Sequence, residues 1–215
     1  MANSILLSRR VLIGGAAGLL SAGAGFAQAL KVATSEQALG PFFPVVRPLD
    51  QDSDLSRVSG SSKIAKGPLI DVFGQVTDRN GRPIPRVRID LWQANAAGRY
   101  AHPGDTSDIP LDPNFQGSAV IFTDDSGHYR FRTVKPGAYD IGGGRKRTPH
   151  IHADIMGRSQ RLTTQMYFPN EPLNDSDILF PSANPKESVI ARAVGPLAGQ
   201  PDVTAFAWDI VLALA

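Results

Sequence analysis

The chain has 215 residues and no cysteine, which excludes disulfide scaffolds, thiolate zinc sites, iron–sulfur clusters and cysteine nucleophiles. Its 21 glycines and 17 prolines, set against only three glutamates, argue against a helical bundle. Its 22 basic residues exceed its 20 acidic residues only through Arg9 and Arg10, so the balanced remainder offers no electrostatic footprint for nucleic acid or an anionic membrane.

Residues 1–29 have the pattern of an export signal. Arg9 and Arg10 supply positive charge, residues 11–25 are apolar and rich in alanine and glycine, and residues 27–29 (AQA) fit a cleavage site. The apolar run is too short and too glycine-rich to span a membrane. The paired arginines resemble a twin-arginine signal, with an ordinary secretory signal or an uncleaved anchor as alternatives. We therefore expect a periplasmic or secreted protein without membrane contact in its mature form.

The rest of the chain alternates apolar and polar residues with period two, and turn residues separate the runs. Residues 30–64 are polar and proline-containing, and we expect an extended arm wrapped on a domain of residues 65–215. Residues 94–117 form a long aperiodic loop of the kind that is usually functional or mobile. Short strands at this spacing predict an all-β, antiparallel β-sandwich with long active-site loops. The expected strands cover residues 69–77, 87–92, 118–123, 128–134, 149–156, 161–168, 187–194 and 203–214.

His150 and His152 lie two residues apart in one expected strand. Residues i and i+2 of a strand share a face, so the two imidazoles lie side by side, while Ile151 and Ala153 face the other way. Such a pair suits a metal ion. However, two ligands rarely hold an ion, and a pair of solvated or core histidines explains the motif about as well.

Further ligands would have to come from residues other than cysteine. Asp154 shares the face of His152 but would reach back to a shared ion awkwardly. The loops and strands also offer His102 and four tyrosines, namely Tyr100, Tyr129, Tyr139 and Tyr167. A phenol has a pKa of about 10, so only a strongly acidic cation such as ferric iron displaces its proton at neutral pH. Two histidines and two tyrosines would describe a ferric site, although spacing alone does not choose among the tyrosines.

Three motifs stand out as a set: residues 91–100 (LWQANAAGRY), 123–139 (TDDSGHYRFRTVKPGAY) and 147–152 (RTPHIH). Together they resemble the intradiol ring-cleavage dioxygenases, and most of all the protocatechuate 3,4-dioxygenase branch. Residues 164–168 and 39–44 add to the resemblance, which spans roughly residues 34–214. Each motif alone would be weak, whereas the set is highly specific.

The resemblance implies one non-haem Fe(III) per chain, bound by Tyr100, Tyr139, His150 and His152. Tyr139 and His150 would be the axial ligands, and Tyr100 and His152 the equatorial ones. The substrates would be a small aromatic diol and O2. The ring would be cleaved between its two hydroxyl-bearing carbons to give a cis,cis-muconate-type diacid.

The same resemblance assigns catalytic roles to Arg147, Tyr139 and Gln165. Arg147 would lie beside the substrate ring and stabilise the negative charge that develops there. Tyr139 would take one proton from the diol, and Gln165 would line the pocket. Minor roles are expected for the remaining candidates: structural for Tyr129, packing for Tyr167, a loop hydrogen bond for His102, a surface turn for His128, and orientation of His152 for Asp154.

One segment departs from the family pattern. Protocatechuate enzymes tend to have an aromatic residue just after the second tyrosine, whereas here Asp140 and Ile141 follow, and then a glycine-rich stretch. This departure leaves the substrate open. Arg145 and Lys146 either pair with a substrate carboxylate or lie in solvent, and we favour solvent.

The resemblance also bears on partners. The chain lacks the N-terminal helical dimerisation domain of catechol 1,2-dioxygenases, which argues against that branch. Protocatechuate enzymes use two kinds of subunit, and a chain with all four ligands would be the iron-bearing one. A homo-oligomer or a second related subunit is therefore compatible with the sequence.

Two other interpretations stay open at this point. A non-enzymatic, transthyretin-like β-sandwich that binds a ligand or a partner would share the strand pattern, but it would be colourless, whereas a tyrosinate–Fe(III) protein is wine-red. The same fold with another metal and a different reaction is the second alternative, which metal analysis of protein purified without added ions would separate.

Overall fold

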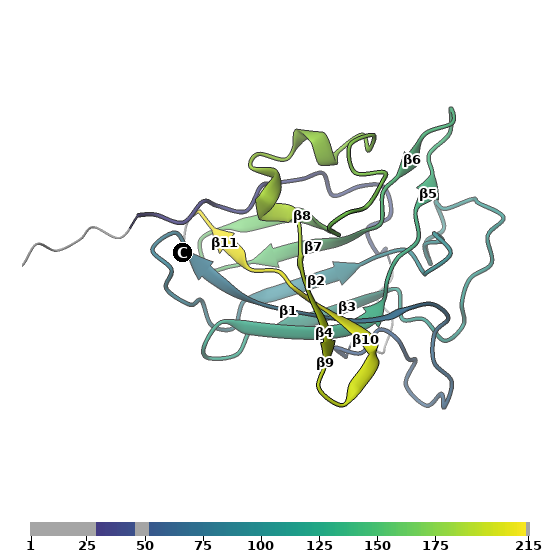
Figure 1. Ribbon diagram of the computed structural model, residues 1–215, viewed down its shortest axis with the longest axis horizontal. Helices are drawn as coiled ribbons and strands as arrows, with labels where there is room; N and C mark the ends of the chain where they lie inside the picture. Colours follow the sequence, from purple (N-terminus) through teal and green to yellow (C-terminus); the bar gives the residue numbers. More distant parts are fainter. Residues whose placement is uncertain (1–28, 46–51, 214–215) are drawn as a thin grey trace, which may run out of the picture.

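The computed structural model describes residues 29–45 and 52–213, so the expected export signal at residues 1–29 lies almost entirely outside them. The described chain is a β-sandwich, which confirms the predicted all-β fold (Figure 1). Two short 3-10 helices, η1 (Phe180–Ser182) and η2 (Lys186–Val189), follow the eighth strand, and no described helix has the length and apolarity to cross a bilayer. The strands are β1 (Leu69–Asp78), β2 (Arg88–Trp92), β3 (Ser118–Phe122), β4 (His128–Val134), β5 (Tyr139–Asp140), β6 (Lys146–Arg147), β7 (His150–Met156), β8 (Arg161–Tyr167), β9 (Arg192–Leu197), β10 (Gln200–Ala207) and β11 (Ile210–Leu212).

Strand β1 is central in the first sheet. It pairs antiparallel with β4 on one side and parallel with β10 and β11 on the other, and β9 pairs with β10. The second sheet has the order β3-β2-β7-β8 and is entirely antiparallel. The sandwich is therefore antiparallel except at β1, where the last strands return after a long connection of the kind that parallel pairing needs.

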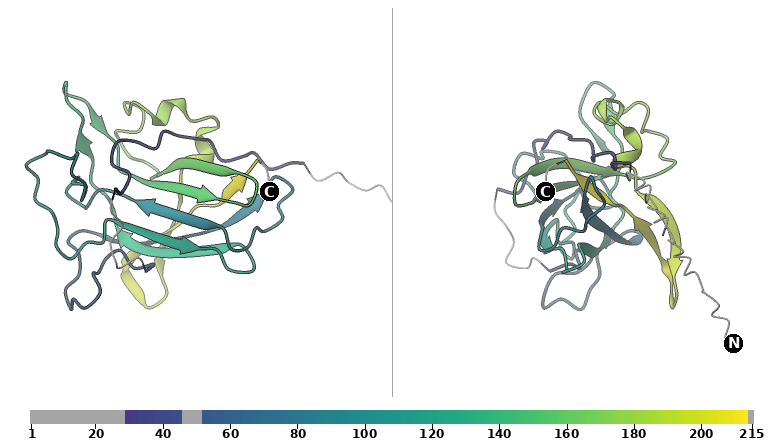
Figure 2. Two further views of the ribbon diagram at one scale, coloured as in Figure 1. Left: turned by 180° about the vertical axis from the view of Figure 1, so that it is seen from behind. Right: turned by 90° about the vertical axis from the view of Figure 1, so that its left-hand side faces the viewer.

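The core lies between the two sheets, which Figure 2 shows as stacked layers. On β7, Ile151, Ala153 and Ile155 are at most 1% exposed and pack against side chains of β1 and β4 in one apolar cluster. Because side chains alternate along a strand, this packing forces His150 and His152 onto the opposite face of the second sheet. The predicted orientation of the two histidines is confirmed.

The N-terminal segment 29–45 covers that opposite face beside β8. The N–H of Gln37 donates to the carbonyl oxygen of Thr163 at 2.9 Å, and the hydroxyl of Thr164 donates to the carbonyl oxygen of Ser35 at 2.8 Å. One face of an antiparallel sheet commonly stays in solvent. Here the arm removes it from water, and the histidine pair is buried as a result.

The C-terminal third differs from the sequence-based expectation. The strand expected at 187–194 is replaced by η2 and then β9, and the strand expected at 203–214 is interrupted at Trp208 and Asp209. Trp208 bonds instead through its N–H to the carbonyl oxygen of Phe73 at 2.9 Å and through its indole N–H to that of Ser188 at 3.1 Å. These bonds bend the chain between β10 and β11. The hairpin of β5 and β6 was not predicted, since two-residue strands carry no periodic signal.

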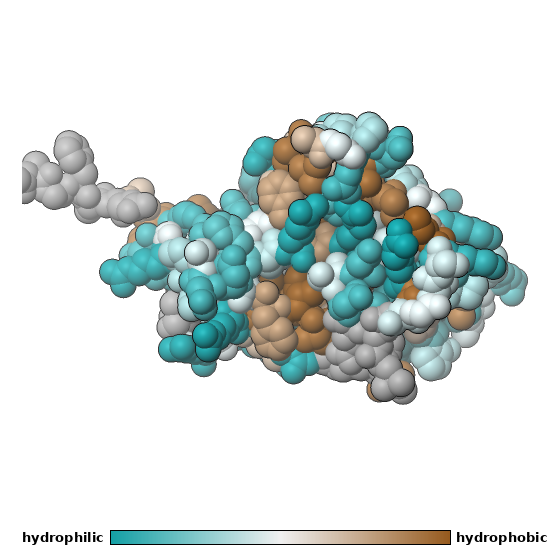
Figure 3. Space-filling model, turned by 90° about the horizontal axis from the view of Figure 1, so that it is seen from below, coloured by the Kyte–Doolittle hydropathy of each residue, from teal (hydrophilic) through white to brown (hydrophobic). Residues whose placement is uncertain are grey.

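The side of the molecule seen from below is largely hydrophilic, with apolar side chains gathered in a band near its middle (Figure 3). A hollow of about 620 Å³ lies among β1, β3, β4 and β10 and is lined by both Phe73 and the 61% exposed Phe122. Tyr129 also lines this hollow. Its hydroxyl donates a hydrogen bond to the carbonyl oxygen of Trp208 at 2.6 Å, so Tyr129 has a structural role, as predicted. His150 and His152 lie elsewhere, on the outer face of the second sheet.

Candidate active site

Side chains that lie opposite one another on β2, β7 and β8 form the base of the candidate site, on the outer face of the second sheet. β7 pairs with β2 so that Trp92 lies opposite His152, and with β8 so that Gln165 lies opposite His152 and Tyr167 opposite His150. All five side chains are at most 2% exposed. The strand register thus gathers residues that are far apart in the sequence into one buried polar patch.

Tyr100 reaches this patch from the long loop after β2. The N–H of Tyr100 donates to the carboxylate of Asp105 at 2.8 Å, which fixes the loop locally. Gly98 has φ +90°, and a side chain there would collide with the backbone oxygen of Ala138, so the tight turn before Tyr100 requires glycine. The hydroxyl of Tyr100 ends 3.4 Å from Nε2 of His150.

Tyr139 approaches from β5, directly across from Arg147 in β6. Its ring meets the ring of Tyr100 edge-on with centroids 5.3 Å apart, and its centroid lies 5.7 Å from that of His150. The structure therefore brings together Tyr100, Tyr139, His150 and His152, which come from a loop, a short hairpin and a core strand.

The two imidazoles bring their Nε2 atoms into the same space, and hydrogen bonding fixes the tautomer of His150. Nδ1 of His150 lies 2.6 Å from the carbonyl oxygen of Thr148, which can only accept, so Nδ1 carries the proton and Nε2 is free of it. The two Nε2 atoms lie 3.2 Å apart. Burial, then the charge of Arg147, lowers the pKa of His150, and burial, then His150 and Arg147, lowers that of His152.

The two phenols need a cation before they can ionise. Burial, reinforced by the neighbouring Tyr139, raises the pKa of Tyr100 well above its ordinary value, and burial raises the pKa of Tyr139 although Arg147 opposes the shift. Within residues 29–45 and 52–213 no three His, Asp or Glu side chains form a metal cluster. Two neutral imidazoles and two phenol oxygens match a hard, strongly acidic trivalent cation better than a divalent one.

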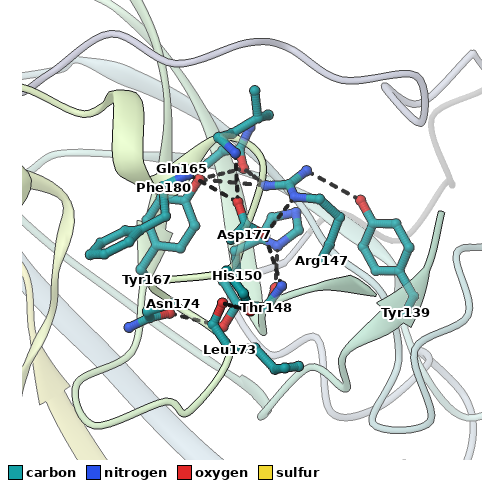
Figure 4. A network of polar contacts seen from close by, with 12 residues as sticks. Tyr139, Arg147, Thr148, His150, Gln165, Tyr167, Leu173, Asn174, Asp177 and Phe180 are labelled. Atoms are coloured by element: carbon teal, nitrogen blue, oxygen red, sulfur yellow. Dashed lines mark hydrogen bonds and ion pairs between the residues drawn. The ribbon is translucent and has the colours of Figure 1, made fainter. Parts of the chain in front are cut away.

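Arg147 is the centre of a polar network behind Tyr139 (Figure 4). Its Nε donates to Asp177 at 2.8 Å, its Nη2 donates to Oε1 of Gln165 at 2.5 Å, and its Nη1 donates to the hydroxyl of Tyr139 at 3.4 Å. Burial opposes ionisation of Asp177, but the N–H of Phe180 and the charge of Arg147 hold its pKa below the usual range. Arg147 and Asp177 therefore form a buried ion pair.

Gln165 and Tyr167 connect this network to the arm. The side-chain amide of Gln165 donates to the carbonyl oxygen of Ala38 at 2.7 Å, and the hydroxyl of Tyr167 lies 3.1 Å from the amide oxygen of Gln37 and 3.0 Å from that of Gln165. Tyr167 packs in a buried apolar cluster with Phe180, as predicted, and its hydroxyl also lies 3.5 Å from Nη2 of Arg147.

Asp154 does not orient His152, contrary to expectation. Its carboxylate accepts from Nε of Arg161 at 2.8 Å and from the hydroxyl of Thr163 at 3.1 Å, and Nδ1 of His152 has no partner among the described residues. The ring of His152 is held instead by Trp92, whose ring stacks on it at 4.7 Å with 7° between the planes. Packing replaces the expected hydrogen bond.

The remaining predictions concern residues outside the cluster. Nδ1 of His102 accepts the N–H of Gly104 at 2.9 Å, which confirms the loop hydrogen bond. His128 is exposed at the start of β4, as expected for a surface turn. Arg145 and Lys146 are also exposed, in agreement with the solvent interpretation.

Sequence reasoning missed Asp177 and Gln37. Asp177 accepts the N–H groups of Leu179 and Phe180 at 2.8 and 2.9 Å, an Asx-type turn that an aspartate shortly before Pro181 could have signalled. Nothing in the sequence links it to Arg147, which lies 30 residues earlier. Gln37 sits in the aperiodic arm, where no pattern marks a buried residue.

The chain is similar to several known proteins. A family model described as dioxygenase matches residues 39–214. The protocatechuate 3,4-dioxygenase beta chain of Burkholderia cepacia is 41% identical over 77% of this chain and 72% of its own length. Catechol 1,2-dioxygenase of Acinetobacter baylyi is 27% identical over 83% of this chain and 63% of its own length.

Among solved structures, the dioxygenase domain of a dioxygenase–carbohydrate-binding protein fusion from the cellulolytic bacterium Streptomyces sp. SirexAA-E is similar, with a TM-score of 0.65. It is 31% identical, and the match covers 86% of this chain and 100% of that domain.

Gly40 provides a test of how closely the arm is fitted to the site. Its φ is +76°, and an added Cβ would lie 3.0 Å from Cε1 of His152. Gly40→Ala should lower the free energy of unfolding by about 1 kcal/mol from backbone strain, plus a further loss because the His152 ring must shift. Chemical denaturation measures the sum.

Gly60→Ala is the matched control, since Gly60 has φ +81° and no atom within 4 Å of an added Cβ. It should show the strain alone. Equal losses in the two variants would contradict the tight contact between the arm and His152.

Proposed function

Because this chain belongs to the intradiol ring-cleavage dioxygenase family, we propose that it uses one non-haem Fe(III) to cleave a catechol-type ring between the two hydroxyl-bearing carbons. The observation that carries the proposal is the convergence of Tyr100, Tyr139, His150 and His152 in one buried space. O2 is the second substrate, and both of its atoms enter the cis,cis-muconate-type diacid. The relatives are named for protocatechuate and catechol, so both are candidate substrates.

The donor set fits ferric iron on chemical grounds. His150 and His152 supply neutral nitrogen atoms, and the hydroxyls of Tyr100 and Tyr139 supply hard oxygen atoms once they are deprotonated. Iron, when bound, would provide the Lewis acidity that ionises the two phenols and the diol and prepares the ring for reaction with O2. The raised pKa values of the phenols support a requirement for such a strongly acidic ion.

The chain's own residues account for substrate binding and proton transfer. The Tyr139 oxygen, once ionised, can accept one proton from the diol, and Nη1 of Arg147 at 3.4 Å would stabilise the ionised form before that transfer. Arg147 would then face the negative charge that develops on the ring. Its guanidinium is held by Asp177 and Gln165, so little reorganisation is needed as the charge moves.

The arm and Trp92 exclude water from the same space. Phe42 packs with its ring 4.6 Å from that of Tyr100, and Trp92 covers one face of His152. A site lined in this way strengthens the electrostatic contribution of Arg147, because charges interact more strongly away from bulk water. The arm would therefore belong to the catalytic unit.

Location and assembly are further parts of the proposal. Residues 1–29 would direct export to the periplasm or beyond. The mature chain would assemble with copies of itself or with a related subunit, since two relatives are named as beta and alpha chains.

Replacing both Arg9 and Arg10 by lysine should retain the precursor in the cytoplasm, and cell fractionation would show this. Light scattering of the mature protein would reveal a monomer if the assembly proposal is wrong.

The proposed ligands predict a selective loss of metal. His150→Ala and His152→Ala should each reduce bound iron by at least about tenfold, because the site loses one of its two nitrogen donors. Plasma mass spectrometry of protein purified without added metal measures this. His102→Ala and His128→Ala are controls of the same residue type and should keep their iron, and equal iron in all four variants would contradict the assignment.

Oxygen uptake by the iron-loaded protein tests the reaction itself. The diols to be tested are catechol, protocatechuate, hydroxyquinol and substituted catechols. The protein should consume at least one of these diols, use one O2 per ring and give a diacid.

Arg147→Gln should lower kcat by about 100-fold, in line with the loss of one preorganised electrostatic group. No uptake with any diol by fully iron-loaded protein would refute the proposed function.

A further inference from the structure

A cavity of about 250 Å³ lies beside Tyr100, between the arm and the loop that follows β2. It is lined by Phe42 of the arm, Trp92 of β2, and Tyr100 and Phe115 of the loop. Of the four side chains that converge in the candidate active site, only Tyr100 lines this cavity. The cavity therefore adjoins the candidate active site without being part of it. Because an apolar cavity of about 150 Å³ can hold a benzene molecule, this one has room for a single substituted ring.

The lining of the cavity suits a neutral, aromatic ligand. None of the described residues that line it is Asp, Glu, Lys or Arg, so a charged ligand would lose its water without gaining a counter-charge. The ring of Phe42 lies 4.6 Å from that of Tyr100 and 5.7 Å from that of His102, and all three residues line the cavity. A further aromatic ring packs favourably against such a cluster, in offset or edge-on contact.

Two residues of the lining also carry polar atoms that lack a partner. Nε1 of Trp92 and Oε1 of Gln116 are buried and have no hydrogen-bond partner among the described residues. Trp92 is 1% exposed and Gln116 is 3% exposed. Buried polar groups in folded proteins are nearly always paired, so the two atoms mark the place of a partner that the chain itself does not supply.

The roles of these two atoms are fixed. Nε2 of Gln116 donates to the carbonyl oxygens of Asp52 and Ser118 at 3.3 and 3.1 Å. Since both carbonyl oxygens can only accept, the amide of Gln116 cannot be flipped, and Oε1 is left as an acceptor. The indole N–H of Trp92 can only donate. The cavity thus offers one donor and one acceptor, and a hydroxyl group matches both because it accepts as well as donates.

We propose that this cavity binds a small neutral phenol, whose ring packs against Phe42, Tyr100 and Phe115 and whose hydroxyl bonds to Trp92 and Gln116. The site is separate from the one proposed for ring cleavage and does not depend on it. Its occupant would nevertheless contact both Tyr100 and Trp92, and the Trp92 ring stacks on that of His152 at 4.7 Å. A phenol bound there would therefore bear on two of the four converging side chains.

Two ligands that differ only by a hydroxyl test the proposal. Isothermal titration calorimetry of the iron-loaded protein compares 4-methylphenol with toluene. Neither is a diol, so neither is a substrate of the proposed reaction. The association constant should be at least about tenfold higher for 4-methylphenol, because only this ligand forms the two hydrogen bonds.

Substitutions in the lining separate the polar contacts from the aromatic ones. Gln116→Leu removes the acceptor with little change in volume, so the preference for 4-methylphenol should fall at least about threefold while toluene binding stays within about twofold. Gln75→Leu makes the same change in the hollow beside β1 and should keep the wild-type preference. Ala101→Trp fills the cavity from an exposed position of its lining and should weaken the binding of both ligands at least about tenfold.

Binding of the phenol to iron is distinguished with His150→Ala, since His150 does not line the cavity. This variant should bind 4-methylphenol within about threefold of the wild type, as expected for independent sites. Loss of binding in His150→Ala would assign the phenol to the metal and overturn the proposal.

The other outcomes are equally decisive. A cavity that holds only water would show no saturable binding of 4-methylphenol, which overturns the proposal, as does an unchanged preference in Gln116→Leu. If Gln116→Leu does not fold, Ala101→Trp decides, because unchanged binding in that variant places the ligand elsewhere. None of these measurements involves ring cleavage, so a protein that oxidises no diol would contradict the proposed function alone.

Discussion

The register of β7 between β2 and β8 is the constraint on which the site depends. Ile151 and Ala153 fill the core between the sheets, so His150 and His152 must share the opposite face, and a slip by one residue would exchange the two sets. The same register places Trp92 beside His152. The apolar core thus positions the polar site, since the energy that fixes the strands is the burial of the residues that alternate with the histidines along β7.

The elements around this strand then close the site from three directions. The arm covers the outer face of the sheet, the loop after β2 brings Tyr100, and the β5–β6 hairpin brings Tyr139 together with Arg147. Asp177, in the connection after β8, binds Arg147 and so ties the hairpin to the segment that follows this edge strand. A buried charge and its counter-charge come from different segments, which makes the geometry of the site dependent on the complete fold.

Periodicity predicted what depends on local alternation. The strands from β1 to β4 and the face shared by His150 and His152 follow from period-two patterns. The choice of Tyr100 and Tyr139 came only from resemblance to a family, because spacing does not show which loop folds back. Asp177 was missed because its partner is distant in sequence, and the role expected of Asp154 was wrong because a nearby arginine and threonine satisfy its carboxylate. Long-range pairing of charges leaves little trace in one sequence.

We propose that Tyr100 and Tyr139 bind ferric iron as phenolates. The most direct measurement is the visible phenolate-to-iron absorption and resonance Raman spectrum of iron-loaded protein in single tyrosine-to-phenylalanine variants. Tyr100→Phe and Tyr139→Phe should each remove one phenolate contribution, whereas Tyr129→Phe and Tyr167→Phe should keep both. A spectrum without phenolate bands, or one that none of the four substitutions changes, would contradict the account.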